Sequence, residues 1–438
     1  MWVLTVAIAL YSTSWVLLTQ TSASLLLPNS EAAKDRLHFA LSIFTASSWR
    51  ELWLKLRILS IIAKQYLVVL PSAAYLWTID EILFGRYRDV VIRMPMITIS
   101  VPRAGTTSFH RTLALDERFV TPNMLELVMP FLCVHKVIYA VHNASPALIH
   151  RLETFLKWIN GVTPEVEARH PISLFSPDAD DILLGEWHWV SVGACRTFPV
   201  ANQWRKHYQM DKQPKHQRGR SLLLHKRLCQ KIMYNRGKND ESWLLLRSHL
   251  SCCVEDFQLM YPDALVVGIL RDPVDVLRSF AGLSAMAISS ATGFNILEGT
   301  YRSKKLLIAG KENDHGNSKT NFILPWPSAF VDILSDMMGR EAGLYGSTNE
   351  ENWKGRCHYV TFYDFKSDPL KSIRALYGKV KLPMTAQFTK AIQRGLGHHE
   401  TYNKRHVYQN PKLEDMEIDE DQFRDIREVK QYSRLVQR

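Results

Sequence analysis

The residues Met96-Ile-Thr-Ile-Ser-Val-Pro-Arg-Ala-Gly-Thr-Thr-Ser-Phe-His110 decide how this chain is organised. The apolar and β-branched residues predict a short strand at 96–101, the glycine predicts a tight turn, and the hydroxyl-rich run predicts the start of a helix. Backbone N–H groups at such a helix start point at one spot, and the helix dipole makes that spot attractive to phosphate or sulfate. Arg103 adds a full charge and a bidentate fork. The segment therefore predicts an anion-binding loop.

This loop lacks the signature of an enzyme that cleaves ATP or GTP. A Walker A loop reads glycine, four residues, then Gly-Lys-Ser or Gly-Lys-Thr. Here Ser100 stands where the first glycine belongs, and Thr106 stands where the lysine belongs. The alternative to an anion loop is an ordinary strand-to-helix turn with capping residues.

Short apolar runs at 243–246, 264–270 and 358–362 are typical of buried parallel strands. Helical stretches separate them, which predicts an α/β fold: a central, mainly parallel sheet with helices on both faces, in three layers. The carboxyl ends of parallel strands share one edge of a sheet. We therefore expect the polar motifs that follow these strands to meet at one rim.

Composition predicts a globular protein, because 46% of the 438 residues are hydrophobic and 11% are aromatic. The formal charge of +11 is uneven: residues 196–240 contain twelve Lys and Arg against two Asp. We interpret this segment as a basic insertion, either simply solvated or a surface for an anionic substrate or membrane headgroups. It lacks interleaved base-stacking aromatics, so we do not expect a nucleic-acid partner.

The N-terminus predicts attachment to a membrane. The first 27 residues carry no charged side chain, and Trp2 to Leu18 is strongly apolar, near the lower length limit of a membrane span. We expect an uncleaved signal-anchor at 1–27, an amphipathic helical region at 31–85 whose apolar face is broken at Pro71, and a catalytic domain at 86–438. A signal peptide cleaved near Ala23 and a buried N-terminal helix are the alternatives.

Cysteine spacing predicts no metal site. The six cysteines include no C-x-x-C pair and no zinc-ligand spacing, and disulfides stay open. Asn143-Ala-Ser145 is a glycosylation sequon, which matters only in a secretory compartment.

Two polar motifs follow the predicted strands. Arg271 leaves the strand at 264–270, Pro273 is suited to a helix start, and Ser279 lies eight residues beyond Arg271 on that helix. Arg247 and His249 come directly after the strand at 243–246. An ordinary salt bridge and a structural histidine are the simpler explanations of these residues.

In this order the motifs resemble those of the sulfotransferase superfamily, which transfers sulfate from 3′-phosphoadenosine-5′-phosphosulfate (PAPS). The loop at 103–108 resembles the loop that binds the 5′-phosphosulfate. Arg271 and Ser279 match the residues that bind the 3′-phosphate, at the family's eight-residue spacing. Arg247-Ser-His-Leu250 resembles the Lys-Thr-His-Leu of the cytosolic members, and the same twenty-four residues separate it from Arg271.

Three further segments strengthen the resemblance, mainly to the broad membrane-linked and bacterial group. Phe84-Gly-Arg-Tyr87 is similar to a Phe-x-Arg-Tyr before the loop, 362–369 resembles the segment whose tyrosine lies by the adenine, and 403–408 resembles a closing segment near the 3′-phosphate. The resemblance covers about four-fifths of the chain and implies a fold like that of the P-loop NTPases. The residues that it places at PAPS are Arg103, Ala104, Gly105, Thr106, Thr107, Ser108, Arg271, Ser279, Tyr363, Lys404 and Arg405.

The resemblance leaves the catalytic base open. The cytosolic members use the histidine that His249 matches, but the broad group often carries proline there. Other members use a glutamate further along the chain, and Glu126 lies twenty-three residues after Arg103. Glu186 and His188 are further alternatives. Arg103 and Arg247 are expected to neutralise charge on the transferring group, where many members carry lysine.

The sequence thus predicts PAPS-dependent transfer of a sulfuryl group to a hydroxyl or amine, without a metal, by an enzyme anchored in the Golgi or secretory pathway. The acceptor is open between a glycan, an aryl alcohol and a lipid alcohol, and 177–189 is a candidate wall for it, with His188 between two tryptophans. One rival is a metal-dependent, membrane-anchored glycosyltransferase that uses Asp178-Ala-Asp180. The other is an inactive relative that only binds a nucleotide or glycan.

Overall fold

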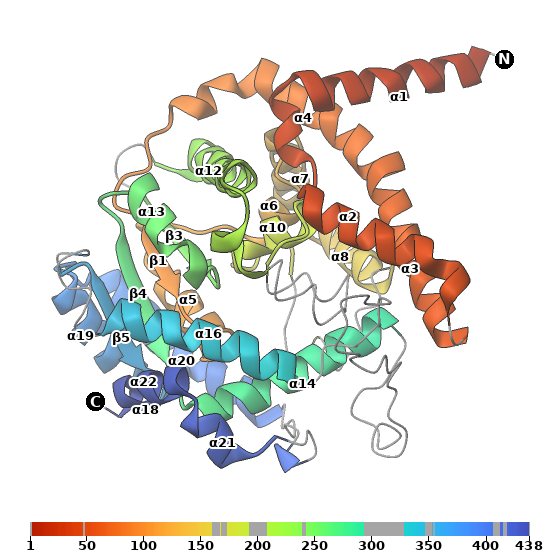
Figure 1. Ribbon diagram of the computed structural model, residues 1–438. Helices are drawn as coiled ribbons and strands as arrows, with labels where there is room; N and C mark the ends of the chain where they lie inside the picture. Colours follow the sequence, from red (N-terminus) through yellow and green to blue (C-terminus); the bar gives the residue numbers. More distant parts are fainter. Residues whose placement is uncertain are drawn as a thin grey trace.

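Five parallel strands form the central sheet, in the order β2-β3-β1-β4-β5 (Figure 1). The computed structural model describes residues 2–46, 49–159, 167, 173–191, 208–238, 242–292, 328–346, 353, 355–405, 412–414 and 418–437. The first part of the predicted basic insertion, 196–207, lies outside these ranges. The strands are β1 Met96–Ile99, β2 Phe119–Val120, β3 Trp243–Ser248, β4 Leu265–Leu270 and β5 Cys357–Thr361.

The predicted strands are confirmed, and β1 lies at the centre of the sheet. It pairs with β3, where Ile99 is the partner of Ser248, and with β4, where Ile97 is the partner of Val266. Strand β2 was not predicted, because its two residues are too short for a periodic pattern; it pairs with the start of β3.

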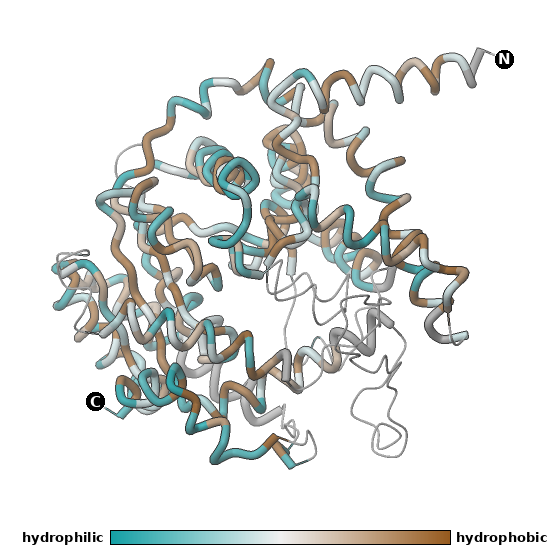
Figure 2. The backbone as a smooth tube through the Cα atoms, in the orientation of Figure 1, coloured by the Kyte–Doolittle hydropathy of each residue, from teal (hydrophilic) through white to brown (hydrophobic). Residues whose placement is uncertain are grey.

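Alternating side chains of the strands enter two hydrophobic clusters, one on each face of the sheet. Ile97 and Leu246 join the cluster that contains helix α12 and the N-terminal helices. Met96 and Leu245 join the cluster of α14, α16 and α22. Figure 2 shows the hydrophobic residues along the strands. The predicted three-layer α/β architecture is therefore confirmed. The helices named here are α12 Lys215–Arg236, α14 Pro273–Thr292, α16 Ser328–Tyr345 and α22 Arg427–Val436.

The N-terminal region is helical, as predicted, and the helix continues through Pro71. A π-helical turn immediately precedes the proline, and the N–H of Leu70 bonds the carbonyl of Gln65. This wider turn lets the chain pass a proline that has no N–H and would crowd the preceding turn of a regular helix. The elements are α1 Trp2–Gln20, η1 Ser22–Leu26, α2 Ser30–Leu41, η2 Ser42–Thr45, α3 Trp49–Lys64, η3 Gln65–Val69, α4 Leu70–Phe84 and η4 Gly85–Asp89.

The remaining elements connect the strands and surround the sheet. They are α5 Thr106–Leu113, α6 Met124–Val128, α7 Leu132–Ala144, α8 Pro146–Ile159, α10 Asp181–Trp187, η6 Met210–Lys212, η8 Ser251–Cys253, α13 Val254–Met260, α18 Phe362–Ser367, α19 Pro369–Lys379, α20 Ala386–Arg405 and α21 Glu420–Asp425.

The described half of the basic segment is largely a core helix. Lys231 of α12 is fully buried, and its Nζ lies 2.8 Å from a carboxylate oxygen of Asp80 on α4. The same Nζ lies 3.5 Å from the centre of the Trp77 ring. Asp80 also accepts hydrogen bonds from the N–H groups of Leu132 and Cys133, at the start of α7. This ion pair therefore joins α4, α7 and α12, and its charges balance inside the protein.

Candidate functional site

The loop between β1 and α5 has a backbone shape that needs glycine. Gly105 has φ +102° and Arg103 has φ +74°. A Cβ at Gly105 would come within 2.5 Å of the Phe362 ring. No side chain caps the first turn of α5, so its N–H groups are available to an anion.

Ser100 ties this loop to the neighbouring strand. Its hydroxyl accepts a hydrogen bond from the N–H of Ile269 at 2.8 Å and donates one to the carbonyl of Ile99 at 2.7 Å. Strand β1 lies where the sheet divides between β3 and β2 on one side and β4 and β5 on the other. Ligands of open α/β sheets bind at such switch points, which is where this loop lies.

Two residues predicted for opposite ends of the nucleotide meet directly. The Nε of Arg103 donates a hydrogen bond to the hydroxyl of Ser279 on α14, at 3.0 Å. Ser279 is only 7% exposed. The loop of β1 and the helix after β4 therefore share one polar cluster.

Arg271 extends this cluster toward α18. Its guanidinium donates to the carbonyl of Arg103 at 3.3 Å, pairs with Asp275 at 3.3 Å, and lies 4.5 Å from the centre of the Phe362 ring. The hydroxyl of Tyr363 donates to Asp275 at 2.8 Å. Burial, followed by the bond to Asp275, raises the pKa of Tyr363 to about 12. Tyr363 thus presents a neutral ring, 48% exposed, beside the predicted phosphate residues.

Arg247 approaches the loop from the other side. It is 2% exposed, donates to the hydroxyl of Thr107 at 2.8 Å, and forms an ion pair with Asp178. The backbone N–H of Asp180 donates to the carbonyl of Arg247 at 2.8 Å. Two arginines, Arg103 and Arg247, therefore flank the loop in a position to face an anion.

Three carboxylates after residue 177 pair with three cationic or titratable groups. Asp178 binds Arg247, Asp180 lies 2.8 Å from Nε2 of His225, and Asp181 lies 3.0 Å from Nδ1 of His249. Burial opposes charge on His225, but Cys229 and the adjacent Asp180 carboxylate outweigh it and raise the pKa of His225 well above its usual value. Asp178 and Asp180, which the rival glycosyltransferase would use for a metal, are both engaged in these pairs.

The two main candidate bases differ in their hydrogen bonds. Both carboxylate oxygens of Glu126 are engaged: one accepts from Tyr139, and the other from Arg236 and from the N–H of Asn123 in a capping box at the start of α6. His249 instead has one ring nitrogen bound to Asp181. Its other nitrogen, Nε2, is shielded from solvent and has no hydrogen-bond partner in the described part of the chain.

His188 has a structural environment. Its Nδ1 lies 2.7 Å from the Ser221 hydroxyl, and its Nε2 lies 2.6 Å from the carbonyl of Leu25. Trp187 and Trp189 are 4% and 3% exposed and pack in the core. The described part of 177–189 is therefore a buried cluster and not an exposed wall for an acceptor. Glu186 is half-buried on α10.

The other predicted residues occupy the expected elements. Ala104 is buried in the loop; Thr106 is buried and Ser108 half-buried in the first turn of α5. Lys404 and Arg405 end α20, and the structure describes only the backbone there.

Several residues of the site were missed by the sequence analysis. Asp275 and Phe362 stood inside motifs but carried no predicted role, and Asp181 directly follows the Asp-x-Asp pair.

His110 of α5 is a further residue near the loop. It is fully buried, and its Nε2 lies 2.7 Å from the hydroxyl of Thr121. Burial, then the charge of Arg247, holds the pKa of His110 well below its usual value. Arg247 follows an apolar run, and a buried arginine needs a nearby carboxylate. That requirement indicated a partner for Arg247 but did not identify Asp178.

Among the described residues, no group of three or more His, Cys, Asp and Glu side chains is arranged to hold a metal ion. Cys133, Cys229, Cys252, Cys253 and Cys357 are free thiols.

The fold is the α/β fold of solved sulfotransferase structures. The chain is similar to sulfotransferase STF1 of Mycobacterium tuberculosis H37Rv, with a TM-score of 0.59 and 15% identity over 96% of this chain and 97% of that one. It is similar to sulfotransferase STF9 of Mycobacterium avium, with a TM-score of 0.59 and 15% identity over 91% of this chain and 95% of that one. No protein-family profile and no curated protein sequence matches the chain. The likeness to solved structures therefore establishes the fold.

Proposed function

We propose that this protein transfers a sulfuryl group from PAPS to a hydroxyl or amine of an acceptor. The observation that carries the proposal is the hydrogen bond between Arg103 and Ser279. It joins the loop suited to a 5′-phosphosulfate to the serine suited to a 3′-phosphate. Arg271 and the exposed ring of Tyr363 extend the same cluster. A ligand with an anion at each end and a purine base fits this set of partners.

The reaction is an in-line displacement at sulfur. The acceptor oxygen forms a bond to sulfur, and the bond from sulfur to the phosphate oxygen breaks, so that 3′-phosphoadenosine-5′-phosphate leaves with the electron pair. By analogy with phosphoryl transfer, positioning and charge stabilisation supply most of the catalysis. The N–H groups of the α5 start, Arg103 and Arg247 would face the charge on the sulfuryl and phosphate oxygens. His249 would take the acceptor proton at Nε2, a contribution of about 10²–10⁴-fold.

Nucleotide binding tests the proposal directly. The full chain should be stabilised against thermal unfolding by 3′-phosphoadenosine-5′-phosphate, since a ligand that binds only the folded state raises its stability. ATP and sugar nucleotides should give smaller shifts. A shift with a sugar nucleotide and Mn²⁺, with none from 3′-phosphoadenosine-5′-phosphate, would favour a glycosyltransferase. Nucleotide binding without transfer of ³⁵S from labelled PAPS to any acceptor pool would favour an inactive relative.

We also propose that α1 attaches the protein to a membrane. Within the described residues, the helical stretch Leu52–Asp89 is long and apolar enough to cross a membrane by length and composition. This differs from the predicted span at 1–27. However, its second half contains Asp80 of the buried ion pair with Lys231 and the buried Trp77, which suit a core helix better than a span.

Helix α1 suits a bilayer better. It has 19 residues, which corresponds to about 28 Å of helix, close to the thickness of the hydrocarbon core. Its first half extends from the body with the N-terminus at its tip (Figure 1), and its second half packs against α4, where the hydroxyl of Tyr75 donates to the carbonyl of Leu10. Apolar side chains along it are exposed, namely Val6, Ile8, Leu10, Tyr11 and Val16.

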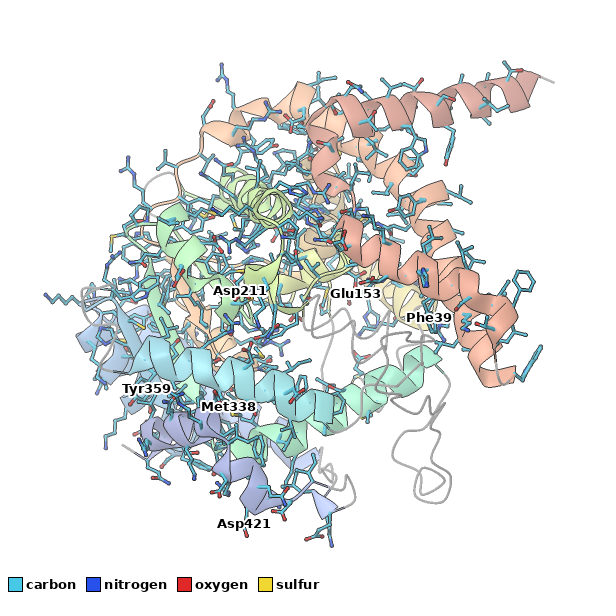
Figure 3. All side chains as sticks on the ribbon, in the orientation of Figure 1. Phe39, Glu153, Asp211, Met338, Tyr359 and Asp421 are labelled. Atoms are coloured by element: carbon cyan, nitrogen blue, oxygen red, sulfur yellow. The ribbon has the colours of Figure 1, made fainter. Side chains whose placement is uncertain are left out.

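The turn between α2 and α3 supports the same attachment. Phe44 is 93% exposed and Trp49 is 76% exposed. Exposed tryptophan is typical of protein at a membrane surface. Near this turn, Nζ of Lys55 on α3 lies 5.6 Å from the centre of the Phe39 ring on α2. Figure 3 labels Phe39.

Membrane attachment is tested by flotation of the full chain with lipid vesicles. Replacing Ile8 and Leu10 by Asp should release the protein, while replacing the exposed Leu259 of α13 by Asp should not. Golgi or secretory location is tested separately, because Asn143 is exposed. In a lumenal protein, Asn143→Gln should remove an endoglycosidase-sensitive mobility shift. Absence of that shift in the parent chain would count against the lumenal location.

A further inference from the structure

His249 differs from the other paired histidine of this region in one respect. Asp181 holds Nδ1 of His249 at 3.0 Å, and Nε2 is shielded from solvent without a hydrogen-bond partner among the described residues. In His225, by contrast, Nε2 lies 2.8 Å from Asp180 and Nδ1 lies 3.8 Å from the sulfur of Cys229. Both ring nitrogens of His225 are therefore occupied, and of these two histidines His249 is the one that keeps a nitrogen for another partner.

The sheet brings this free nitrogen to the level of the anion loop. Ser248, the last residue of β3, is the register partner of Ile99, the last residue of β1. His249 follows Ser248 as Ser100 follows Ile99. His249 therefore leaves the sheet at the same edge and at the same level as the start of the anion loop. Two residues earlier on the same strand, Arg247 already reaches Thr107 in the first turn of α5.

The carboxylate of Asp181 is built into the fold. Its side chain is 5% exposed, while the side chain of His249 is 13% exposed. Asp181 is the first residue of α10, and the preceding residue bonds the backbone carbonyl of Arg247 through its N–H. The start of α10 is thus fixed against the end of β3, which sets the position of the carboxylate relative to the ring.

We propose that Asp181 is a positioning residue for His249, an inference that rests on the proposed sulfuryl transfer. An ionised carboxylate only accepts hydrogen bonds, so it selects the imidazole tautomer with the proton on Nδ1. That tautomer presents the lone pair of Nε2 to the acceptor hydroxyl. When the acceptor oxygen bonds to sulfur, its proton moves to Nε2, and the resulting imidazolium is balanced by Asp181. The carboxylate keeps its own charge throughout, as in the aspartate–histidine pairs of hydrolases.

The kinetic test compares Asp181→Asn with Asp180→Asn. Asp181→Asn should lower kcat by about 100-fold, in line with the value of a general base, with little change in KM for PAPS. Asp180→Asn removes an equally buried partner from His225, and it should lower the melting temperature without a comparable loss of kcat. A kcat of Asp181→Asn within about twofold of the parent chain would overturn the inference.

A double-mutant cycle separates positioning from general damage. If Asp181 acts through His249, then Asp181→Asn combined with His249→Ala should be no slower than His249→Ala alone. Multiplied losses would overturn the inference. The proposed function is judged separately, because 3′-phosphoadenosine-5′-phosphate should stabilise the parent and both variants equally.

Nitrogen NMR gives a readout that needs no turnover. In the full chain labelled with ¹⁵N-histidine, the neutral form of His249 should carry its proton on Nδ1 and none on Nε2. His249→Gln identifies its signals by their loss. A proton on Nε2 in place of Nδ1 would overturn the inference, whatever the substrate proves to be.

Discussion

The Nε of Arg103 lies 3.0 Å from the hydroxyl of Ser279, although 176 residues separate them in the chain. The loop arginine follows β1, and the serine lies two turns into the helix after β4. A ligand with two anionic ends would meet both residues at once, one at each end. We therefore expect Ser279 to contribute to binding of a nucleotide that carries both a 5′-phosphate and a 3′-phosphate.

Ser279→Ala should weaken binding of 3′-phosphoadenosine-5′-phosphate by about 10- to 100-fold, since a hydrogen bond to a charged group contributes about 1.5–3 kcal/mol. Calorimetric titration measures the change. Adenosine 5′-phosphosulfate, which has no 3′-phosphate, should be affected much less. Ser284→Ala is the matched control, because Ser284 is another buried serine of α14. Equal losses for both nucleotides would remove Ser279 from the 3′-phosphate.

Gly105→Ala should destabilise the protein by about 1–3 kcal/mol, the range for a side chain forced into a disfavoured backbone region. Two causes combine: the φ of +102° and the 2.5 Å approach of the new Cβ to the Phe362 ring. Urea unfolding measures the cost, and nucleotide affinity should fall as the loop shifts.

Gly219→Ala is the control for that measurement. Gly219 lies in α12 and a Cβ there meets nothing within 4 Å, so alanine should stabilise the helix by about 0.5–1 kcal/mol. A Gly105→Ala protein as stable as the parent chain would show that the loop adopts a different shape.

Asp178→Leu should destabilise the protein by about 3–5 kcal/mol, because it leaves the buried Arg247 without its ionic partner. The change is measured as the free energy of unfolding in urea. Adding Arg247→Met to Asp178→Leu should recover much of that stability, because no buried charge then remains. The double variant should lack sulfuryl transfer, since Arg247 is proposed to face the transferring group. If the second change recovers no stability, the ion pair is not the cause.

Lowering the pH should destabilise the protein partly through His188. Burial lowers the pKa of His188 to about 4, whereas an unfolded chain holds a histidine near about 6.5. Between these values the unfolded chain binds a proton that the folded chain does not, so stability falls as the pH drops from about 6.5 to 4. The loss from this one group is about 3 kcal/mol. His188→Gln should show a smaller loss of unfolding free energy between pH 7 and pH 4.5 than the parent chain, and an equal loss would contradict the assignment.

Local sequence patterns predicted the parts of this structure that depend on neighbours in the chain. The strand at 265–270 is a continuous apolar run, the strand at 96–99 is a run of apolar and β-branched residues, and the loop at 103–108 is a contiguous motif. The Asn123-x-x-Glu126 pattern of a capping box was also present. It was the local sign that Glu126 has a structural role.

Tertiary pairings could not be predicted in this way. The acids at 178–181 find Arg247, His225 and His249 only because α10 and α12 pack against the end of β3. The spacing in the sequence suggests that the two aspartates of the Asp-x-Asp pair act together. In the folded protein, Asp178 instead pairs with Arg247 and Asp180 pairs with His225. The π-turn before Pro71 was missed for a related reason, because a proline in a helical pattern usually signals an end.

The segment that follows α1 has a mechanical consequence. Ser22 accepts a hydrogen bond from the indole of Trp77 at 3.1 Å, and the carbonyl of Leu25 is bonded to His188 at 2.6 Å. These two hydrogen bonds fix the segment after α1 to the rest of the protein, so α1 is attached rigidly at its C-terminal end. If α1 stands in a bilayer, the rim that carries Arg103 is held at one height and one tilt above the lipid. If the proposed sulfuryl transfer also holds, acceptors would then be selected by the distance of the reacting group from the membrane as well as by their chemistry.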